Sequence, residues 1–150
     1  MSGAGDLYQQ VILEHNKKPR NFRKIDGATH HAEGFNPLCG DHLWVYLTVG
    51  ENGLIDDIAF EGSGCAICKA SASLMTTSLK GRSVDEAQTL FREFQELLTK
   101  QLDPEKDPHS LGKLKIFSGI WRYPARVKCA ALAWHTLNGA ISRQQSVSTE

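Results

Sequence analysis

The sequence lacks a long apolar run, a surplus of either charge and a leader-like beginning. None of its segments approaches the roughly 18 consecutive apolar residues that a membrane-spanning helix needs. Residues 1–8 do not join a basic segment to an apolar one, so we expect no secretory signal. Lys and Arg total 17, as do Asp and Glu, so the net charge is zero. Nucleic-acid and membrane-surface binders normally carry a basic surplus. We therefore expect neither nucleic acid nor membrane as a partner, and a cytoplasmic location.

The composition is that of an ordinary globular protein, with 41% hydrophobic and 23% charged residues. A chain of 150 residues buries roughly 70% of its unfolded surface, so it does not need disulfides or a metal to fold. No internal repeat and no linker interrupts it. We expect one domain over residues 1–150, with a core at about 6–141 and a frayed polar tail at 143–150.

Cysteine is scarce, with four residues in the chain: Cys39, Cys65, Cys68 and Cys129. In a reducing compartment, cysteines are more often thiolate ligands or reactive groups than disulfides. The alternative is that they are small buried apolar side chains, which is a common fate of free cysteine.

Local patterns predict a helix, then strands, in the first half of the chain. A helix at 6–16, capped by Asp6, ends before Pro19. Alternating apolar residues predict strands at 42–49 and 54–61, joined by an Asn-Gly turn. A weaker pattern predicts a strand at 28–33.

Helical patterns dominate the second half. Apolar spacing predicts a helix from Cys65 to Leu79, whose small residues at 70–73 would let another backbone approach closely. Ser83 and Glu86 form a capping box that opens a second amphipathic helix. A polar loop at 103–108 and a segment at 110–123 of ambiguous pattern follow. Pro124 suits the first turn of a last, mostly buried helix.

Three of the cysteines lie in positions that suit reactive or metal-binding thiols. One lies in a turn, and the other two lie where the local charge favours the thiolate. Cys39 lies in a turn before a strand, with Asp41 two residues on. Cys65 opens a helix, whose N-terminus lowers the pKa of a thiol. Cys129 lies near Arg126 and Lys128, whose charges we expect to favour its thiolate. These residues make up a Cys₃Asp donor set that zinc accepts, although ligands so far apart in sequence have no diagnostic spacing.

Two other interpretations use Cys65 and Cys68. His31 and Glu33 followed by this pair imitate the H-x-E…C-x-x-C pattern of zinc deaminases. Against that, Gly34 interrupts the required helix, and two cysteines would have no role. The pair alone imitates a thioredoxin-type redox motif, but lacks the surrounding βαβ pattern.

Taken together, three cysteine segments resemble the motifs of the IscU/NifU N-terminal family of iron–sulfur cluster assembly proteins. These segments are Asn36–Asp41, Gly62–Met75 and Ala125–Trp134, and the early segment Leu7–Phe22 matches as well. The resemblance covers residues from about 6 to 141. It is greatest to the SufU branch, because 83–118 lengthens the interval between the motifs and Lys128 stands where the scaffold branch has histidine. It implies an α+β fold: a small antiparallel sheet of about three strands with helices packed on it.

The resemblance also implies a function. Zn²⁺ would be held by Cys39, Asp41, Cys65 and Cys129. Cys39 would accept persulfide sulfur from a SufS-type cysteine desulfurase, for delivery to a downstream Fe–S assembly scaffold. The chain would then be a sulfurtransferase-like partner of the desulfurase rather than a stand-alone enzyme. Two alternatives remain: a scaffold that assembles a [2Fe–2S] cluster on the same residues, and a structural zinc protein that only binds a partner.

Two further features bear on this site. Cys68 stands where the branch commonly has serine, and is a candidate accessory residue together with Lys128 and Arg126. The basic segment Lys17–Lys24, which includes Arg20 and Arg23, is a candidate docking surface for the desulfurase, together with cations near Cys129.

Overall fold

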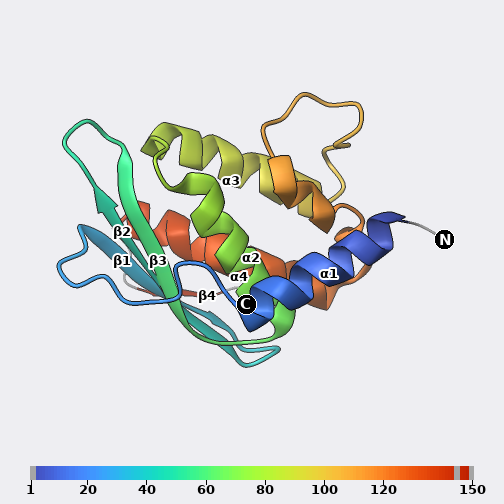
Figure 1. Ribbon diagram of the computed structural model, residues 1–150, viewed down its shortest axis with the longest axis horizontal. Helices are drawn as coiled ribbons and strands as arrows, with labels where there is room; N and C mark the ends of the chain where they lie inside the picture. The colour runs from blue at the N-terminus through green and yellow to red at the C-terminus, as the bar shows by residue number, and fades with distance from the viewer. Residues whose placement is uncertain (1–2, 144–145, 149–150) are drawn as a thin grey trace.

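A computed structural model describes residues 3–143 and 146–148 as an α+β fold, which confirms the predicted class. Figure 1 shows the helices gathered beside one twisted sheet. The helices are α1 (Gly3–Lys17), α2 (Ala66–Leu79), α3 (Val84–Leu98) and α4 (Pro124–Ile141), with short 3₁₀ helices η1 (Gly112–Phe117) and η2 (Ile120–Arg122). The strands are β1 (His30–Asn36), β2 (Asp41–Val49), β3 (Ile55–Ser63) and β4 (Ser146–Ser148).

The sheet has four strands in the order β3-β2-β1-β4. The pairs β1/β2 and β2/β3 are antiparallel, whereas β4 runs parallel to β1. The sheet therefore has one strand more than the about three expected, because residues 146–148 form β4 where we expected a frayed tail. This segment pairs its backbone with Glu33–Phe35 on the free edge of β1. The segment Ser-Val-Ser is too short to carry a recognisable strand pattern, so the pairing could not be predicted from the sequence. Residues 144–145 and 149–150 of the predicted tail lie outside the described part of the chain.

The central hairpin forms as predicted. Leu43, Val45 and Leu47 on β2 are fully buried, as an alternating pattern with one buried face requires. The turn ends at Gly53, whose φ of 78° is costly for any residue with a side chain. Strand β1 also forms, two to three residues later than predicted, and continues through Gly34.

Two helix starts test the capping predictions. Helix α3 opens with the predicted capping box: Ser83 Oγ accepts from the Glu86 backbone N–H, and the Glu86 carboxylate accepts from the Ser83 N–H, both at 3.0 Å. Helix α1 begins at Gly3, so the prediction that Asp6 caps it is wrong. Asp6 lies in the first turn instead, where a negative charge still favours the helix dipole.

Helices α2 and α4 lie against the sheet, while α1 and α3 pack outside them (Figure 1). The small residues of α2 allow the close approach that the sequence predicted, because Ser71 Oγ donates to the Ala130 carbonyl of α4 at 2.6 Å. Gly34 does the same between β1 and α4: a Cβ there would lie 2.0 Å from Thr136 Oγ1. This tight packing holds α2 against α4 and α4 against β1.

In the described part of the chain, no helix combines the length and apolar character that crossing a membrane would require.

Candidate metal centre

The sheet register brings two of the candidate ligands together. His42 of β2 pairs with Ser63 of β3, so the start of β2 lies beside the chain that leads into α2. Asp41 is 2% exposed, and its Oδ1 accepts the backbone N–H of Cys65 at 2.9 Å. Gly64 permits this approach, because a Cβ there would lie 3.0 Å from the same oxygen. The carboxylate is thereby held at the N-terminus of α2.

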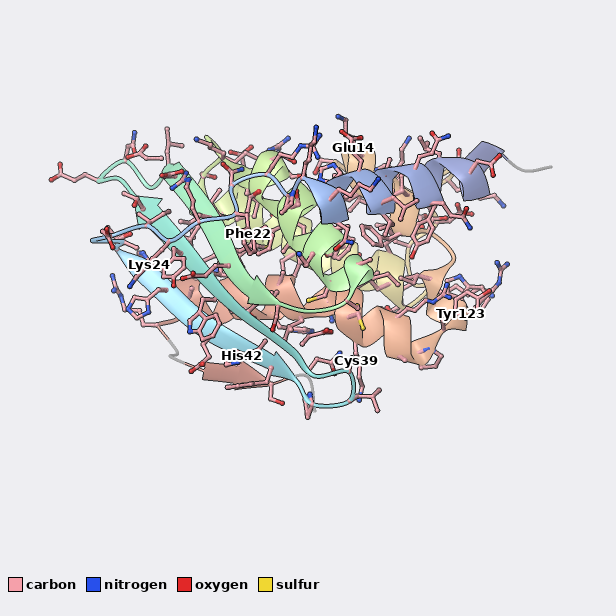
Figure 2. The ribbon with its side chains drawn as sticks, turned by 60° about the horizontal axis from the view of Figure 1, so that its bottom comes forward. Glu14, Phe22, Lys24, Cys39, His42 and Tyr123 are labelled. Carbon is pink, nitrogen blue, oxygen red and sulfur yellow. The ribbon has the colours of Figure 1, made fainter. Side chains whose placement is uncertain are left out.

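Cys39 lies in the tight turn between β1 and β2, at the end of the sheet (Figure 2). The backbone N–H groups of Cys39 and Gly40 both donate to the Asn36 carbonyl, at 3.2 and 2.9 Å. Gly40 adopts a φ of 74°, which lets the chain turn back into β2. Among the described residues, which include all four cysteines, Cys39 alone is an exposed cysteine.

Cys129, on the second turn of α4, completes the cluster. Its Sγ donates to Cys39 Sγ at 3.4 Å. The ligand atoms of Cys39, Asp41 and Cys129 all lie within 4.8 Å of one another. Cys65 adjoins this group through the hydrogen bond from its backbone N–H to Asp41 Oδ1. The structure thus brings Cys39, Asp41 and Cys129 together, and it places Cys65 beside this group but outside the set of ligand atoms within 4.8 Å of one another.

Cys65 is the thiolate-forming member of the pair that it makes with Cys129. The neighbouring Cys129 thiol lowers the pKa of Cys65 to about 6, despite its burial, and the N–H groups of Cys68 and Ile67 lower it further. This agrees with the predicted effect of a helix N-terminus. The neighbouring Cys65, burial and the hydrogen bond to Cys39 raise the pKa of Cys129. The expectation that nearby cations favour a Cys129 thiolate is therefore wrong for this arrangement, in which Cys129 is the hydrogen-bond donor.

Asn36 is a residue of the site that the sequence did not reveal. It is fully buried, and its Nδ2 donates to Asp41 Oδ2 at 3.3 Å and contacts Cys129 Sγ at 3.7 Å. Its Oδ1 has no hydrogen-bond partner among the described residues. Asn36 therefore orients the carboxylate toward the thiols. In the sequence it had the pattern of an ordinary Asn-Pro turn residue.

Tyr8 of α1 is a second residue that sequence reasoning missed. Its hydroxyl is buried, and within the described chain it has no hydrogen-bond partner. The ring packs edge-on against Phe117, with centroids 6.1 Å apart. Burial raises the pKa of Tyr8, the charge of Arg126 lowers it, and the charges of Cys65 and Cys129 raise it again. The phenol thus lies near the thiols, although it is far from them in sequence.

The three candidate accessory residues lie in different surroundings. Cys68 is fully buried, and burial together with the charges of Asp41, Cys65 and Cys39 raises its pKa. The Arg126 guanidinium lies 4.5 Å from the centroid of the Tyr123 ring. Lys128 lines a separate hollow of about 300 Å³ with His135, and none of the described cysteines lines that hollow.

The candidate docking cations are ion-paired. Arg20 pairs with Glu14 at 2.5 Å, and Arg23 pairs with Asp57 at 2.6 Å. Figure 2 shows that the chain at Phe22 and Lys24 runs along the sheet away from Cys39.

The donor set suits a soft or borderline metal. Thiolates and a carboxylate oxygen are ligands for zinc, and thiolates also hold iron–sulfur clusters. Both oxygens of Asp41 already accept hydrogen bonds from N–H groups, which fixes the carboxylate without using all its lone pairs. The deaminase interpretation does not fit, because His31 and Glu33 lie on strand β1 rather than on a helix.

Comparison with known proteins shows the family. The family model for the NifU-like N-terminal domain matches residues 7–145. The chain belongs to this family. The predicted resemblance is therefore confirmed, and it spans the helix that carries Tyr8 as well as the three cysteine segments.

Two curated relatives and one solved structure are similar along most of the chain. The iron–sulfur cluster assembly scaffold protein IscU of Streptococcus pyogenes is 36% identical over 95% of this chain and 87% of its own. The zinc-dependent sulfurtransferase SufU of Bacillus subtilis is 34% identical over 93% of this chain and 92% of its own. A crystal structure of a putative scaffold protein for the SUF system of Fervidobacterium islandicum matches with a TM-score of 0.82 and 32% identity, covering 93% of this chain and 99% of that one.

Proposed function

We propose that this member of the family is a zinc-dependent sulfur acceptor of the SufU type. Cys39 takes sulfur from the persulfide of a SufS-type cysteine desulfurase and hands it to a downstream Fe–S assembly scaffold. The observation that carries the proposal is the contrast in exposure within one cluster. Cys39 is exposed on a turn, whereas Cys65 is half-buried and Cys129 is buried. The relative named a zinc-dependent sulfurtransferase supports the choice of metal and reaction.

Cys65, Cys129, Cys39 and Asp41 would hold the zinc, which keeps the thiols deprotonated at neutral pH. Cys65 and Cys129 belong to helices packed in the core and would keep their places. Cys39 lies on a turn next to Leu38, which is 65% exposed, so a partner's persulfide has access to it. An exposed nucleophile beside ligands anchored in the core is what sulfur acceptance needs.

The transfer itself is a thiolate displacement. The Cys39 thiolate attacks the outer sulfur of the desulfurase persulfide and forms a new S–S bond. The S–S bond within the desulfurase persulfide breaks, and the desulfurase cysteine leaves as a thiolate. Cys39 then carries the extra sulfur as a persulfide. Oxidation state is conserved overall, so the step needs neither oxidant nor reductant.

A second function, assembly of a [2Fe–2S] cluster on the same residues, is favoured by the relatives named scaffold proteins. Metal analysis and a visible spectrum after anaerobic purification separate the two. Stoichiometric zinc without charge-transfer bands supports the acceptor. Brown protein with iron and acid-labile sulfide would overturn it in favour of the scaffold.

Stimulation of a desulfurase then separates the acceptor from a structural zinc protein. In a closed structural site every ligand matters for folding and none for turnover. We expect the zinc protein to increase the rate at which a SufS-type desulfurase consumes cysteine. No increase, with zinc bound and the fold intact, would leave only the structural role.

A further inference from the structure

Cys68 lies directly behind the proposed zinc ligands. It occupies the first turn of α2, and its backbone N–H donates to Cys65 Sγ at 3.4 Å. Its side chain shares one small space with Asp41: a Cβ built on Gly64 would lie 3.2 Å from Cys68 Sγ and 3.0 Å from Asp41 Oδ1. The fourth thiol is therefore adjacent to the ligand set rather than elsewhere in the core.

Three of the four proposed ligands act on Cys68 electrostatically. The charges of Asp41, Cys65 and Cys39 all reach its thiol. Cys68 also belongs to the hydrophobic core cluster, so it lies where that core meets the proposed ligands. Cys68 is also fully shielded from solvent, so no external reagent competes for its sulfur.

Sulfur acceptance by Cys39 creates a coordination problem. When Cys39 attacks a persulfide, only Cys65, Cys129 and Asp41 remain to hold the metal. Structural zinc sites are four-coordinate, and an open position takes up water or another ligand. The replacement should be soft, close by and mounted on an element that does not have to unfold.

We propose that Cys68 is a reserve ligand that takes the place of Cys39 while Cys39 carries sulfur. This inference rests on the proposed function, since it presumes that Cys39 leaves the metal. On exchange, the bond between Cys39 and the metal breaks and a bond to Cys68 forms. The proton of the Cys68 thiol is released to solvent, and is taken up again when Cys39 returns. The number of thiolates on the metal stays at three throughout.

Cobalt(II) in place of zinc counts these thiolates directly, because each Co–thiolate bond contributes to the near-ultraviolet charge-transfer absorption. The test compares wild type, Cys39→Ala, Cys68→Ala and the double variant, each loaded anaerobically with one equivalent of Co²⁺. We expect Cys39→Ala to keep the wild-type intensity, because Cys68 replaces the lost ligand. In the double variant the intensity falls to about two thirds, since two thiolates of three remain.

Either of two results in the cobalt absorption would overturn the proposal. If Cys39→Ala already shows the reduced intensity, and removal of Cys68 changes nothing further, Cys68 does not ligate. If Cys68→Ala alone reduces the intensity, Cys68 is a resident ligand rather than a reserve one. Circular dichroism and a parallel set built on Cys68→Ser, which preserves side-chain size, guard against misfolding. Failure of the proposed function is distinguishable, because it would show as a wild-type protein without cobalt–thiolate bands or without desulfurase stimulation.

Discussion

The carboxylate of Asp41 accepts the backbone N–H of Cys65 at 2.9 Å. This single bond joins the first residue of β2 to the residue that caps α2. It thereby links two proposed metal ligands and orients both before any metal binds.

The hydrogen bond between the Cys65 N–H and the Asp41 carboxylate should stabilise the folded protein as well as orient the proposed ligands. We expect Asp41→Ala to lower the free energy of unfolding of the metal-free protein by about 1–3 kcal/mol, because it leaves a helix N–H without its acceptor. Asp41→Asn retains an acceptor oxygen and should lose less. Urea denaturation in the presence of a chelator measures both. Equal stability of all three proteins would show that the bond does not support the fold.

Close packing of β1 on α4 predicts a second stability effect. A Cβ at position 34 would lie 2.0 Å from Thr136 Oγ1, so Gly34→Ala should destabilise the protein by about 1–3 kcal/mol. Adding Thr136→Ala removes the obstructing oxygen and should recover part of the loss. Thermal unfolding of the two single variants and the double variant provides the comparison. Additive losses in the double variant would contradict this explanation.

Structural features that depend only on residues close together in the sequence, such as turns and helix caps, could be predicted. The Ser83–Glu86 box and the Asn52-Gly53 turn are local patterns, and both formed as expected. The β4 strand and the burial of Asn36 depend on partners that are distant in the sequence, so no local sequence pattern predicted either of them. The meeting of Cys39, Cys65 and Cys129 was predicted through resemblance to a family, because residues so far apart in sequence meet only through the sheet register and helix packing.

His15 predicts how stability depends on pH. Nδ1 of His15 lies 2.7 Å from Ser73 Oγ, which also accepts the Arg20 backbone N–H at 2.8 Å. Burial lowers the pKa of His15, and the charge of Arg20 lowers it further. The unfolded state therefore binds the proton more readily than the folded state.

Stability from His15 is fully present above its unfolded pKa of about 6.5 and is lost as the pH falls below that value. We expect the unfolding free energy of the metal-free protein to decrease from about pH 7 to about pH 5.5. His15→Gln should flatten this slope. An identical slope in His15→Gln and wild type would assign the pH dependence to other groups.

The basic segment predicts a salt-dependent interaction with the desulfurase. Reversing the charges of Arg20 and Arg23 should weaken binding more at low ionic strength than at high ionic strength. Glu14→Gln and Asp57→Asn are matched controls, because they break the same ion pairs but keep both cations. Titration calorimetry at two salt concentrations measures the effect. Controls that weaken binding as much as the reversals would show that the ion pairs matter for structure and not for docking.

The most direct test of the account locates the transferred sulfur. Zinc-loaded protein is incubated with a SufS-type desulfurase and cysteine, persulfides are trapped by alkylation, and peptide mass spectrometry identifies the cysteine that carries the extra sulfur. We predict that it is Cys39, and that Cys39→Ala accepts none and no longer stimulates the desulfurase while still binding some zinc. Sulfur on Cys65 or Cys129, or undiminished stimulation by Cys39→Ala, would contradict the account.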